Sequence, residues 1–190
     1  MSFLLSLSRL IDNINVKIGE WVRWALLIAV LICSGNAIVR YTFNMSSNAW
    51  LEIQWYLFGL VYLLAAPYTL RVNEHVRIDV LISRFSMHTR VWIDIFGFVL
   101  FFFPFTLLVL YYATPYAVMA IESKEMSSNA GGLIMWPAKI LIPIGFLLLN
   151  LQGLSELIKR IGYLMGMVDG SEFEKAAAPM AMAVTPTKPE

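Results

Sequence analysis

Four long apolar stretches alternate with shorter polar segments along the chain. None of the four contains Lys, Arg, Asp or Glu, and they cover Trp24 to Val39, Ile53 to Leu70, Ile95 to Ile121 and Ile140 to Ser155. With its apolar flanks, each is about as long as a helix that crosses roughly 30 Å of hydrocarbon at about 1.5 Å per residue. The pattern therefore predicts an all-α membrane protein with four transmembrane helices, at about residues 21–43, 50–70, 92–119 and 132–157.

Residues 1–20 have a different, amphipathic pattern. Apolar residues recur at helical spacing on one side, namely Phe3, Leu4, Leu7, Leu10, Ile11, Ile14 and Ile18. The other side carries Arg9, Asp12, Asn13 and Lys17. Such periodicity is typical of a helix that lies in the plane of the membrane interface. We therefore predict an N-terminal amphipathic interfacial helix over residues 1–20, ahead of a single transmembrane domain over residues 21–165.

Two further segments outside the spans have distinctive compositions. Between spans two and three, apolar residues within 76–85 interleave with Arg77, Asp79 and Arg84. This pattern predicts a short interfacial helix whose arginines extend toward the headgroups. Residues 166–190 include a run rich in Ala, Pro, Thr and Met without periodicity, which predicts a disordered tail.

Basic residues predict the orientation of the spans. Lys and Arg gather before span one, between spans two and three, and after span four. By the positive-inside rule, both termini and the middle loop face the cytoplasm, and the other two loops face outward. Tryptophans near span ends form an aromatic belt at headgroup level, and four of them are predicted interfacial anchors: Trp21, Trp24, Trp92 and Trp136.

Composition narrows the possible functions. The chain of 190 residues is 59% hydrophobic and has a net charge of +1, so it lacks the basic surface that nucleic acid requires. The single cysteine, Cys33, is interpreted as a packed residue of span one. Both histidines, His75 and His88, lie outside the spans, where they could not ligate a haem held between helices. We expect no catalytic residue, no metal site and no cofactor.

Charged residues at the span ends are the strongest polar signal. Arg40 ends span one and Glu52 begins span two, on the predicted outer side. The two are close enough in sequence to form an ion pair that locks the helices together. A contact with a partner subunit and an ion path are the alternatives. Near the inner ends, four charged residues are interpreted as interfacial anchors: Asp94, Glu156, Lys159 and Arg160.

Three ordered blocks of sequence carry a family resemblance. Residues 40–58 contain RYTFN and SSNAWLEIQWYLF, residues 68–80 contain YTLR and NEHVRIDV, and residues 131–156 contain GGL, WP, QG and SE. Together they resemble the small membrane subunit of tripartite ATP-independent periplasmic (TRAP) transporters. The resemblance extends over about residues 5–165.

This resemblance implies a bacterial inner-membrane protein that binds a large membrane subunit on a separate chain. In this family the large subunit carries the sodium and substrate sites and moves as an elevator, while a periplasmic binding protein delivers organic acids. The small subunit would enlarge the static scaffold, contact membrane lipids and contribute to docking of the binding protein. Sodium-coupled transport is therefore the expected function, without catalysis.

The resemblance also suggests two groups of partner contacts. The outer rim would comprise Arg40, Asn44, Ser47, Asn48, Trp50 and Glu52. The inner rim would be organised by Arg71, His75, Arg77 and Asp79. Many relatives carry two adjacent acidic residues after the tryptophan that corresponds to Trp50, whereas here Glu52 is followed by Ile53 and Gln54.

Two other functions stay open at this point. A haem-binding or other anchor subunit of a membrane complex would also have four apolar helices, and its purified form would be coloured. A self-sufficient small channel would require polar residues at mid-depth, where this sequence is nearly all apolar.

Overall fold

A computed structural model describes residues 2–45, 47–72 and 85–168. Its helices are α1 (Ser2–Phe43), α2 (Asn48–Arg71), α4 (Met87–Gly97), the π-helical turn η1 (Phe98–Phe102), α5 (Phe103–Glu122) and α6 (Trp136–Leu164). Because α4, η1 and α5 follow one another without a break, they form one long helix. The four resulting helices are long and apolar enough to cross a membrane, which confirms the predicted all-α membrane protein with four spans.

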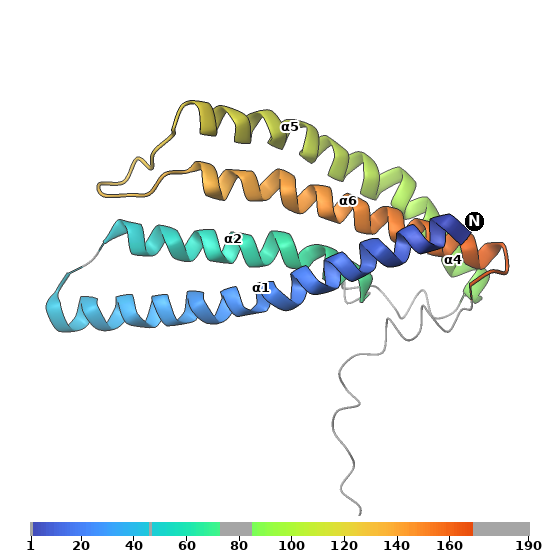
Figure 1. Cartoon of the computed structure of the whole chain (residues 1–190), viewed down its shortest axis with the longest axis horizontal. Coiled ribbons are helices and arrows are strands. Elements are labelled where there is room, and N and C mark those ends of the chain that lie inside the picture. The colour runs from blue at the N-terminus through green and yellow to red at the C-terminus, as the bar shows by residue number, and fades with distance from the viewer. Residues whose placement is uncertain (1, 46, 73–84, 169–190) are drawn as a thin grey trace, which may run out of the picture.

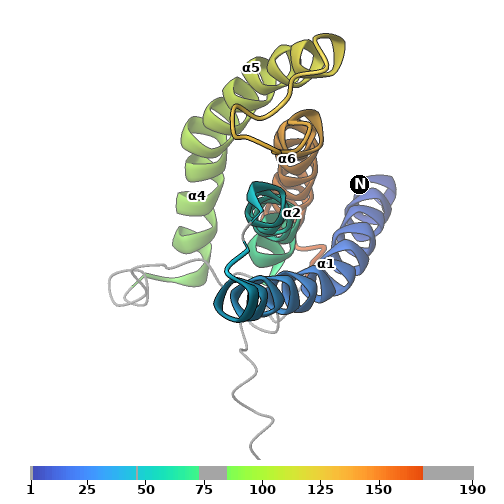
Figure 2. The same ribbon diagram turned by 90° about the vertical axis from the view of Figure 1, so that its left-hand side faces the viewer.

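The helices lie side by side in the order α1, α2, α6, α5 (Figures 1 and 2). Helix α2 packs on α1 and on α6, and α6 packs in turn on α5. The N-terminal half of α1 also bends across to contact α6. The arrangement is thus an open row with α1 and α5 at its edges, and two ends can be distinguished. The hairpin end carries the loops after α1 and α5, and the N-terminal end carries the N-terminus and the end of α6.

Helix α1 runs without interruption through the boundary expected near residue 20. One stripe at seven-residue spacing is buried along it, formed by Ser8, Asn15, Val22 and Ala29. The predicted N-terminal segment and span one therefore form a single helix, and the position of residues 1–20 in the membrane interface stays a prediction. One residue differs from the expected amphipathic pattern, because Asp12 is buried against α6 rather than exposed.

Small residues allow the helices to approach closely. A Cβ atom on Gly145 of α6 would lie 2.8 Å from Cβ of Leu63 on α2. A Cβ atom on Gly153 would lie 2.4 Å from the ring of Phe102. Without a hydrophobic driving force between helices in lipid, such close backbone packing is a main source of association. These glycines fix the neighbours of α6 on both sides.

Prolines shape two of the helices. The π-helical turn ends two residues before Pro104, and the N–H of Phe103 donates to the carbonyl of Phe98. A wider turn accommodates a residue that lacks an N–H and whose ring would otherwise clash with the preceding turn. Helix α6 begins at Trp136 rather than at the predicted residue 132, because Pro137 suits the first turn of a helix and Gly131 has a positive φ of 70°.

The distribution of side chains is that of a protein in lipid. Large apolar residues such as Leu31, Phe101 and Leu108 point outward, while many of the buried side chains are polar or charged. The bundle is therefore held together from within by polar contacts, and most of these contacts gather at its two ends, apart from a hydrogen bond of 2.8 Å from Thr106 to Asn150 between them.

Candidate functional site

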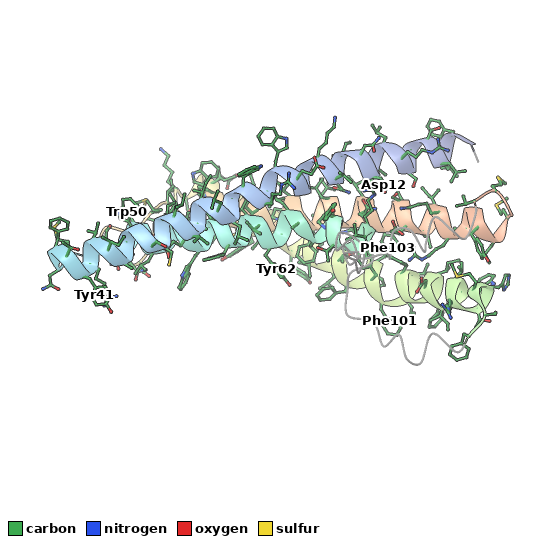
Figure 3. The ribbon with its side chains drawn as sticks, turned by 90° about the horizontal axis from the view of Figure 1, so that it is seen from below. Asp12, Tyr41, Trp50, Tyr62, Phe101 and Phe103 are labelled. Carbon is green, nitrogen blue, oxygen red and sulfur yellow. The ribbon has the colours of Figure 1, made fainter. Side chains whose placement is uncertain are left out.

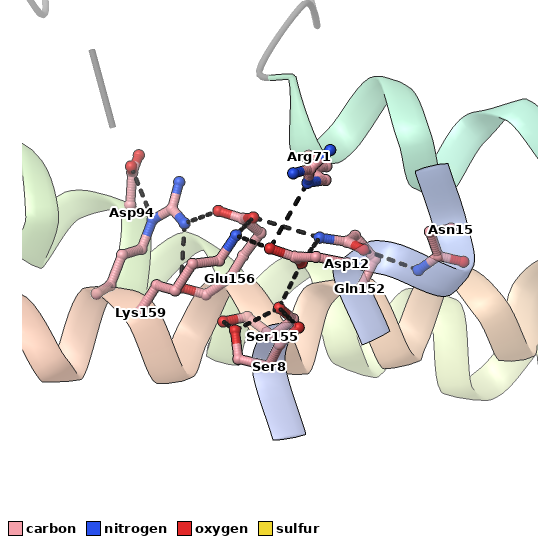
Figure 4. A network of polar contacts seen from close by, with 10 residues as sticks. Ser8, Asp12, Asn15, Arg71, Asp94, Gln152, Ser155, Glu156 and Lys159 are labelled. Atoms are coloured by element: carbon pink, nitrogen blue, oxygen red, sulfur yellow. Dashed lines mark hydrogen bonds and ion pairs between the residues drawn. The ribbon is translucent and has the colours of Figure 1, made fainter. Parts of the chain in front are cut away.

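Ten residues at the N-terminal end form a connected polar network, here called the N-terminal cluster (Figure 4). Its members are Ser8, Asp12, Asn15, Arg71, Asp94, Gln152, Ser155, Glu156, Lys159 and Arg160. They come from α1, α2, α4 and α6, so one network links all four spans.

Asp12 is the centre of this network. Its Oδ1 accepts hydrogen bonds from Ser155 Oγ at 2.7 Å and from Gln152 Nε2 at 2.8 Å. Its Oδ2 lies 3.1 Å from Lys159 Nζ and 3.6 Å from Arg71 Nε. A single carboxylate thus joins α1 to both α2 and α6.

Arg160 makes the second junction of the cluster. Its Nη1 donates to Glu156 Oε2 at 2.6 Å, and its Nε donates to Asp94 Oδ2 at 3.0 Å. The guanidinium also lies 5.0 Å from the ring centre of Phe98. Glu156 and Arg160 are only 5% and 4% exposed. These two residues and Asp94, which the sequence suggested as interfacial anchors, bind one another inside the protein, and their position at the membrane interface stays a prediction.

The charges of the N-terminal cluster balance. Three acidic residues, Asp12, Asp94 and Glu156, meet three basic residues, Arg71, Lys159 and Arg160. Buried ions that are fully paired can hold elements in a fixed arrangement, and removal of one partner is costly. The cluster therefore has the chemistry of a clamp between helices.

At the other end, Glu52 holds a loop in place. Its Oε1 accepts hydrogen bonds from Ser127 Oγ and from Asn129 Nδ2, the latter at 2.9 Å. Its Oε2 accepts a hydrogen bond of 2.6 Å from the backbone N–H of Leu133. One buried carboxylate on α2 thereby closes the hairpin formed by residues 123–135.

Three more side chains attach this hairpin to the helices. Asn48 Nδ2 donates to the carbonyl of Ala130 at 2.9 Å, and the Tyr56 hydroxyl donates to the carbonyl of Ile134 at 3.0 Å. Lys139 forms an ion pair with Glu125, and its Nζ lies 4.1 Å from the centre of the Tyr116 ring. We call this set the hairpin cluster: Asn48, Glu52, Tyr56, Glu125, Ser127, Asn129 and Lys139.

Close packing at Gly132 shows how tightly the hairpin lies on Glu52. A Cβ atom there would be 2.5 Å from Cβ of Ser127 and 2.7 Å from Oε1 of Glu52. A side chain at this position would overlap both atoms, so the close approach of the hairpin to Glu52 depends on glycine at position 132.

The predicted outer-rim residues all lie at the hairpin end, and their contact with a partner stays a prediction. Arg40 and Asn44 lie exposed at the end of α1, Ser47 is the N-cap of α2, and Trp50 is exposed on its first turn. Glu52 binds the hairpin, and its ion pair with Arg40, left open by the sequence, is not formed in the described part of the chain.

The inner-rim residues are described only in part. Arg71 belongs to the N-terminal cluster. His75, Arg77 and Asp79 lie outside the described residues, as do most of the predicted interfacial helix and most of the predicted tail. The four predicted tryptophan anchors, Trp21, Trp24, Trp92 and Trp136, all have exposed side chains.

Sequence reasoning missed some members of both clusters and assigned others, such as Asp12, Glu156 and Lys159, to the membrane interface. Ser8, Asp12 and Asn15 recur at helical spacing on α1, and Gln152, Ser155, Glu156 and Lys159 do so on α6. Two polar stripes inside otherwise apolar helices were a usable signal that the helices face one another. Lys139, next to the start of an apolar stretch, was also overlooked.

The described residues include no group of three or more His, Cys, Asp or Glu side chains that could hold a metal ion. The carboxylates of the two clusters instead bind basic side chains, hydroxyls, amides and a backbone N–H.

Comparison with protein families gives one result. The family model described as tripartite ATP-independent periplasmic transporters, DctQ component, matches residues 28–162. The match includes the C-terminal part of α1 from residue 28, all of α2 and nearly all of α6, with both loops of the hairpin end. No curated protein and no solved structure is significantly similar to the chain.

Proposed function

Since the chain belongs to the DctQ-component family of tripartite ATP-independent periplasmic transporters, we propose that it is the non-catalytic small membrane subunit of a sodium-coupled transporter for organic acids. In this role it enlarges the static scaffold of an elevator-type large subunit and contributes to docking of the periplasmic binding protein. It resides in the bacterial inner membrane with both termini in the cytoplasm. Membership of the family is the observation that carries this proposal.

The scaffold role is supported by the position of the two polar clusters. The N-terminal cluster links four spans at one end, and the hairpin cluster ties α2 to α6 through the loop at the other. Helices fixed at both ends resist sliding and tilting relative to one another. A static scaffold needs this property, because an elevator moves its substrate against a part that stays in place.

The docking role is supported by the fixed shape of the hairpin. Hydrogen bonds to Glu52 and Tyr56 hold residues 127–134 against α2, while Asn129, Ala130 and Gly131 at the tip stay exposed. A surface that is already ordered loses little conformational entropy on binding. Together with Arg40 and Trp50, the tip would form the outer rim that receives the binding protein.

Sodium and substrate sites are assigned to the large subunit. The N-terminal cluster pairs its carboxylates with an equal number of basic side chains, so it offers no unpaired carboxylate to a cation. This balance supports a scaffold function for the small subunit and a separate location for the transported ions.

Purification of the tagged chain from native membranes in mild detergent tests the proposal. We expect a much larger polytopic protein to co-purify at a near one-to-one ratio. Proteoliposomes that contain both subunits should then take up a carboxylate solute only with the binding protein and an inward sodium gradient. Recovery of the chain alone, recovery with a redox enzyme, or ion flux through the chain by itself would contradict the proposal.

A further inference from the structure

One side of α2 presents an exposed aromatic stripe. Leu51, Trp55, Phe58 and Tyr62 recur at intervals of four, three and four residues, so they lie along one face of the helix. Trp55 is 76% exposed and Tyr62 is 77% exposed. Tyr62 projects from α2 on the edge that faces away from Asp12 (Figure 3).

Tyr62 lies at the middle of the span. Glu52 and Arg71 belong to the two polar clusters, and the rise between them along α2 is about 28 Å, close to the hydrocarbon thickness of about 30 Å. Tyr62 is about 15 Å from the level of Glu52 and about 14 Å from that of Arg71. Its hydroxyl therefore lies near the bilayer centre.

Depth and a neighbouring glycine together distinguish Tyr62 from the other exposed tyrosines of the described residues. Tyr41 is close to the end of α1. Tyr111 and Tyr112 lie about 15–17 Å along α5 from its last residue, Glu122, at a depth similar to that of Tyr62, but α5 contains no glycine. Tyrosine is normally enriched at the membrane interface, where its hydroxyl meets water or headgroups.

The Tyr62 hydroxyl forms no hydrogen bond with the residues that the structure describes. Lipid tails offer no acceptor, and the side chain is too short to reach either interface. A protein surface with a hydrogen-bond acceptor at mid-depth would satisfy this group, whereas lipid would leave it unsatisfied.

A glycine beside Tyr62 supports close approach of another helix. A Cβ atom on Gly59 would meet nothing within 4 Å, in contrast to one on Gly145 or Gly153. Packing within the chain therefore does not require a small residue at position 59. A helix from a second protein could pack closely there, between Trp55 and Tyr62.

We propose that the face of α2 formed by Trp55, Phe58, Gly59 and Tyr62 binds a transmembrane helix of the large subunit. That helix carries a hydrogen-bond acceptor, a side-chain oxygen or a free backbone carbonyl, opposite the Tyr62 hydroxyl. The inference rests on the proposed function, because it names the surface through which the small subunit joins its membrane partner.

Photocrosslinking locates the contact without destabilising the protein. A photoreactive phenylalanine analogue is placed at position 58 or 62 of α2 and, for comparison, at position 31 of α1 or 108 of α5. These four positions are all exposed to the surroundings of the chain. After illumination of native membranes, we expect positions 58 and 62 to crosslink to the large subunit, and positions 31 and 108 to crosslink mainly to lipid.

Matched substitutions test the energetics of the same surface. Gly59→Leu should lower the amount of large subunit that co-purifies at least tenfold, because the added side chain blocks the approach. Tyr62→Phe, which removes only the hydroxyl, should lower it several-fold. The controls are Gly35→Leu, also at a glycine with open space, and Tyr112→Phe, and both should retain the partner as the wild type does. Membrane yield and monodisperse elution of each variant establish that it folds.

Each outcome decides the question. If the wild-type chain retains the large subunit but position 62 crosslinks only to lipid or to a second copy of this chain, the assignment of the face is wrong and the proposed function stands. Loss of the partner in Gly35→Leu but not in Gly59→Leu would likewise overturn the assignment in favour of α1. If the wild type retains no large membrane protein, the proposed function fails and this inference fails with it.

Discussion

The two polar clusters fix opposite ends of the same helices by different chemistry. At the N-terminal end, six ionised side chains from four helices pair with one another, and every one of them projects from a helix. At the hairpin end, the single carboxylate of Glu52 binds two side chains and one backbone N–H of a loop. The first arrangement sets the position of helix against helix. The second sets the shape of a loop.

The two clusters are therefore expected to have different roles, the first in the stability of the helix row and the second in the shape of the surface that binds a partner. A change in the N-terminal cluster should loosen the whole helix row, because the cluster links all four spans. A change in the hairpin cluster should open residues 123–135 while the helices stay packed. Variants at the two ends therefore distinguish a clamp from a shaped surface.

The largest effect is expected from Arg160→Met. The substitution removes the ion pairs to Asp94 and Glu156 and leaves buried carboxylates with fewer partners, which typically costs about 3–5 kcal/mol of unfolding free energy. Equilibrium unfolding in detergent, followed by circular dichroism, measures the loss. Arg9→Met is the matched control, since Arg9 is exposed. Equal stability of Arg160→Met and wild type would show that the cluster does not clamp the helices.

A smaller and local effect is expected from Glu52→Ala. This variant removes the carboxylate that accepts three hydrogen bonds from the hairpin, and the loss should be about 1.5–3 kcal/mol in total against local opening, because the freed groups of this exposed loop can bind water. Hydrogen exchange should rise at Leu133 and its neighbours, while exchange in α5 and α6 stays unchanged. Binding of the periplasmic protein should weaken while the large subunit remains bound. Loss of the large subunit instead would assign Glu52 to assembly of the membrane complex rather than to the hairpin.

The spans were predictable from sequence because length and apolarity alone decide whether a helix can cross a membrane. Their arrangement in a row was not, since it depends on which small residues meet which side chains. Gly145 packs against Leu63, and Gly153 packs against Phe102, although the two residues of each pair are far apart in the sequence. Hydropathy contains no information on such pairs.

The clusters were predictable only in part, for a related reason. Glu52 stood out as a charge at a span end, but its partner Leu133 is 81 residues away in sequence. Asp12 was interpreted as part of a polar face toward the headgroups, because amphipathic spacing alone does not tell which face meets water and which meets another helix. Its partner Gln152 lies 140 residues away, in a stretch that hydropathy treats as uniformly apolar.

Gly132→Ala tests the shape of the hairpin without removing a polar group. The added methyl would overlap Ser127 and Glu52, and overpacking of this kind typically costs about 1–3 kcal/mol. We expect faster proteolysis between residues 126 and 133 with unchanged thermal unfolding of the helices. Gly131→Ala introduces the same methyl where space is open but φ is positive, so it separates backbone strain from steric overlap. If the two variants were cleaved at equal rates, overlap with Glu52 would not be the constraint.

The smallest effect is expected from Ser8→Ala, and it sharpens the contrast between neutral and charged contacts within the N-terminal cluster. Ser8 and Ser155 share a hydroxyl hydrogen bond of 2.7 Å, but Ser155 also donates to Asp12 and so keeps a partner when Ser8 is lost. Hydrogen bonds between membrane helices contribute about 0.6 kcal/mol on average, and the same equilibrium unfolding assay should show a change of that order. A loss as large as that of Arg160→Met would mean that the clamp depends on the close approach of α1 to α6 at Ser8, with the ion pairs secondary. A loss of only a few tenths of a kcal/mol would mean that the charged groups around Asp12 and Arg160 contribute most of the stability of the clamp.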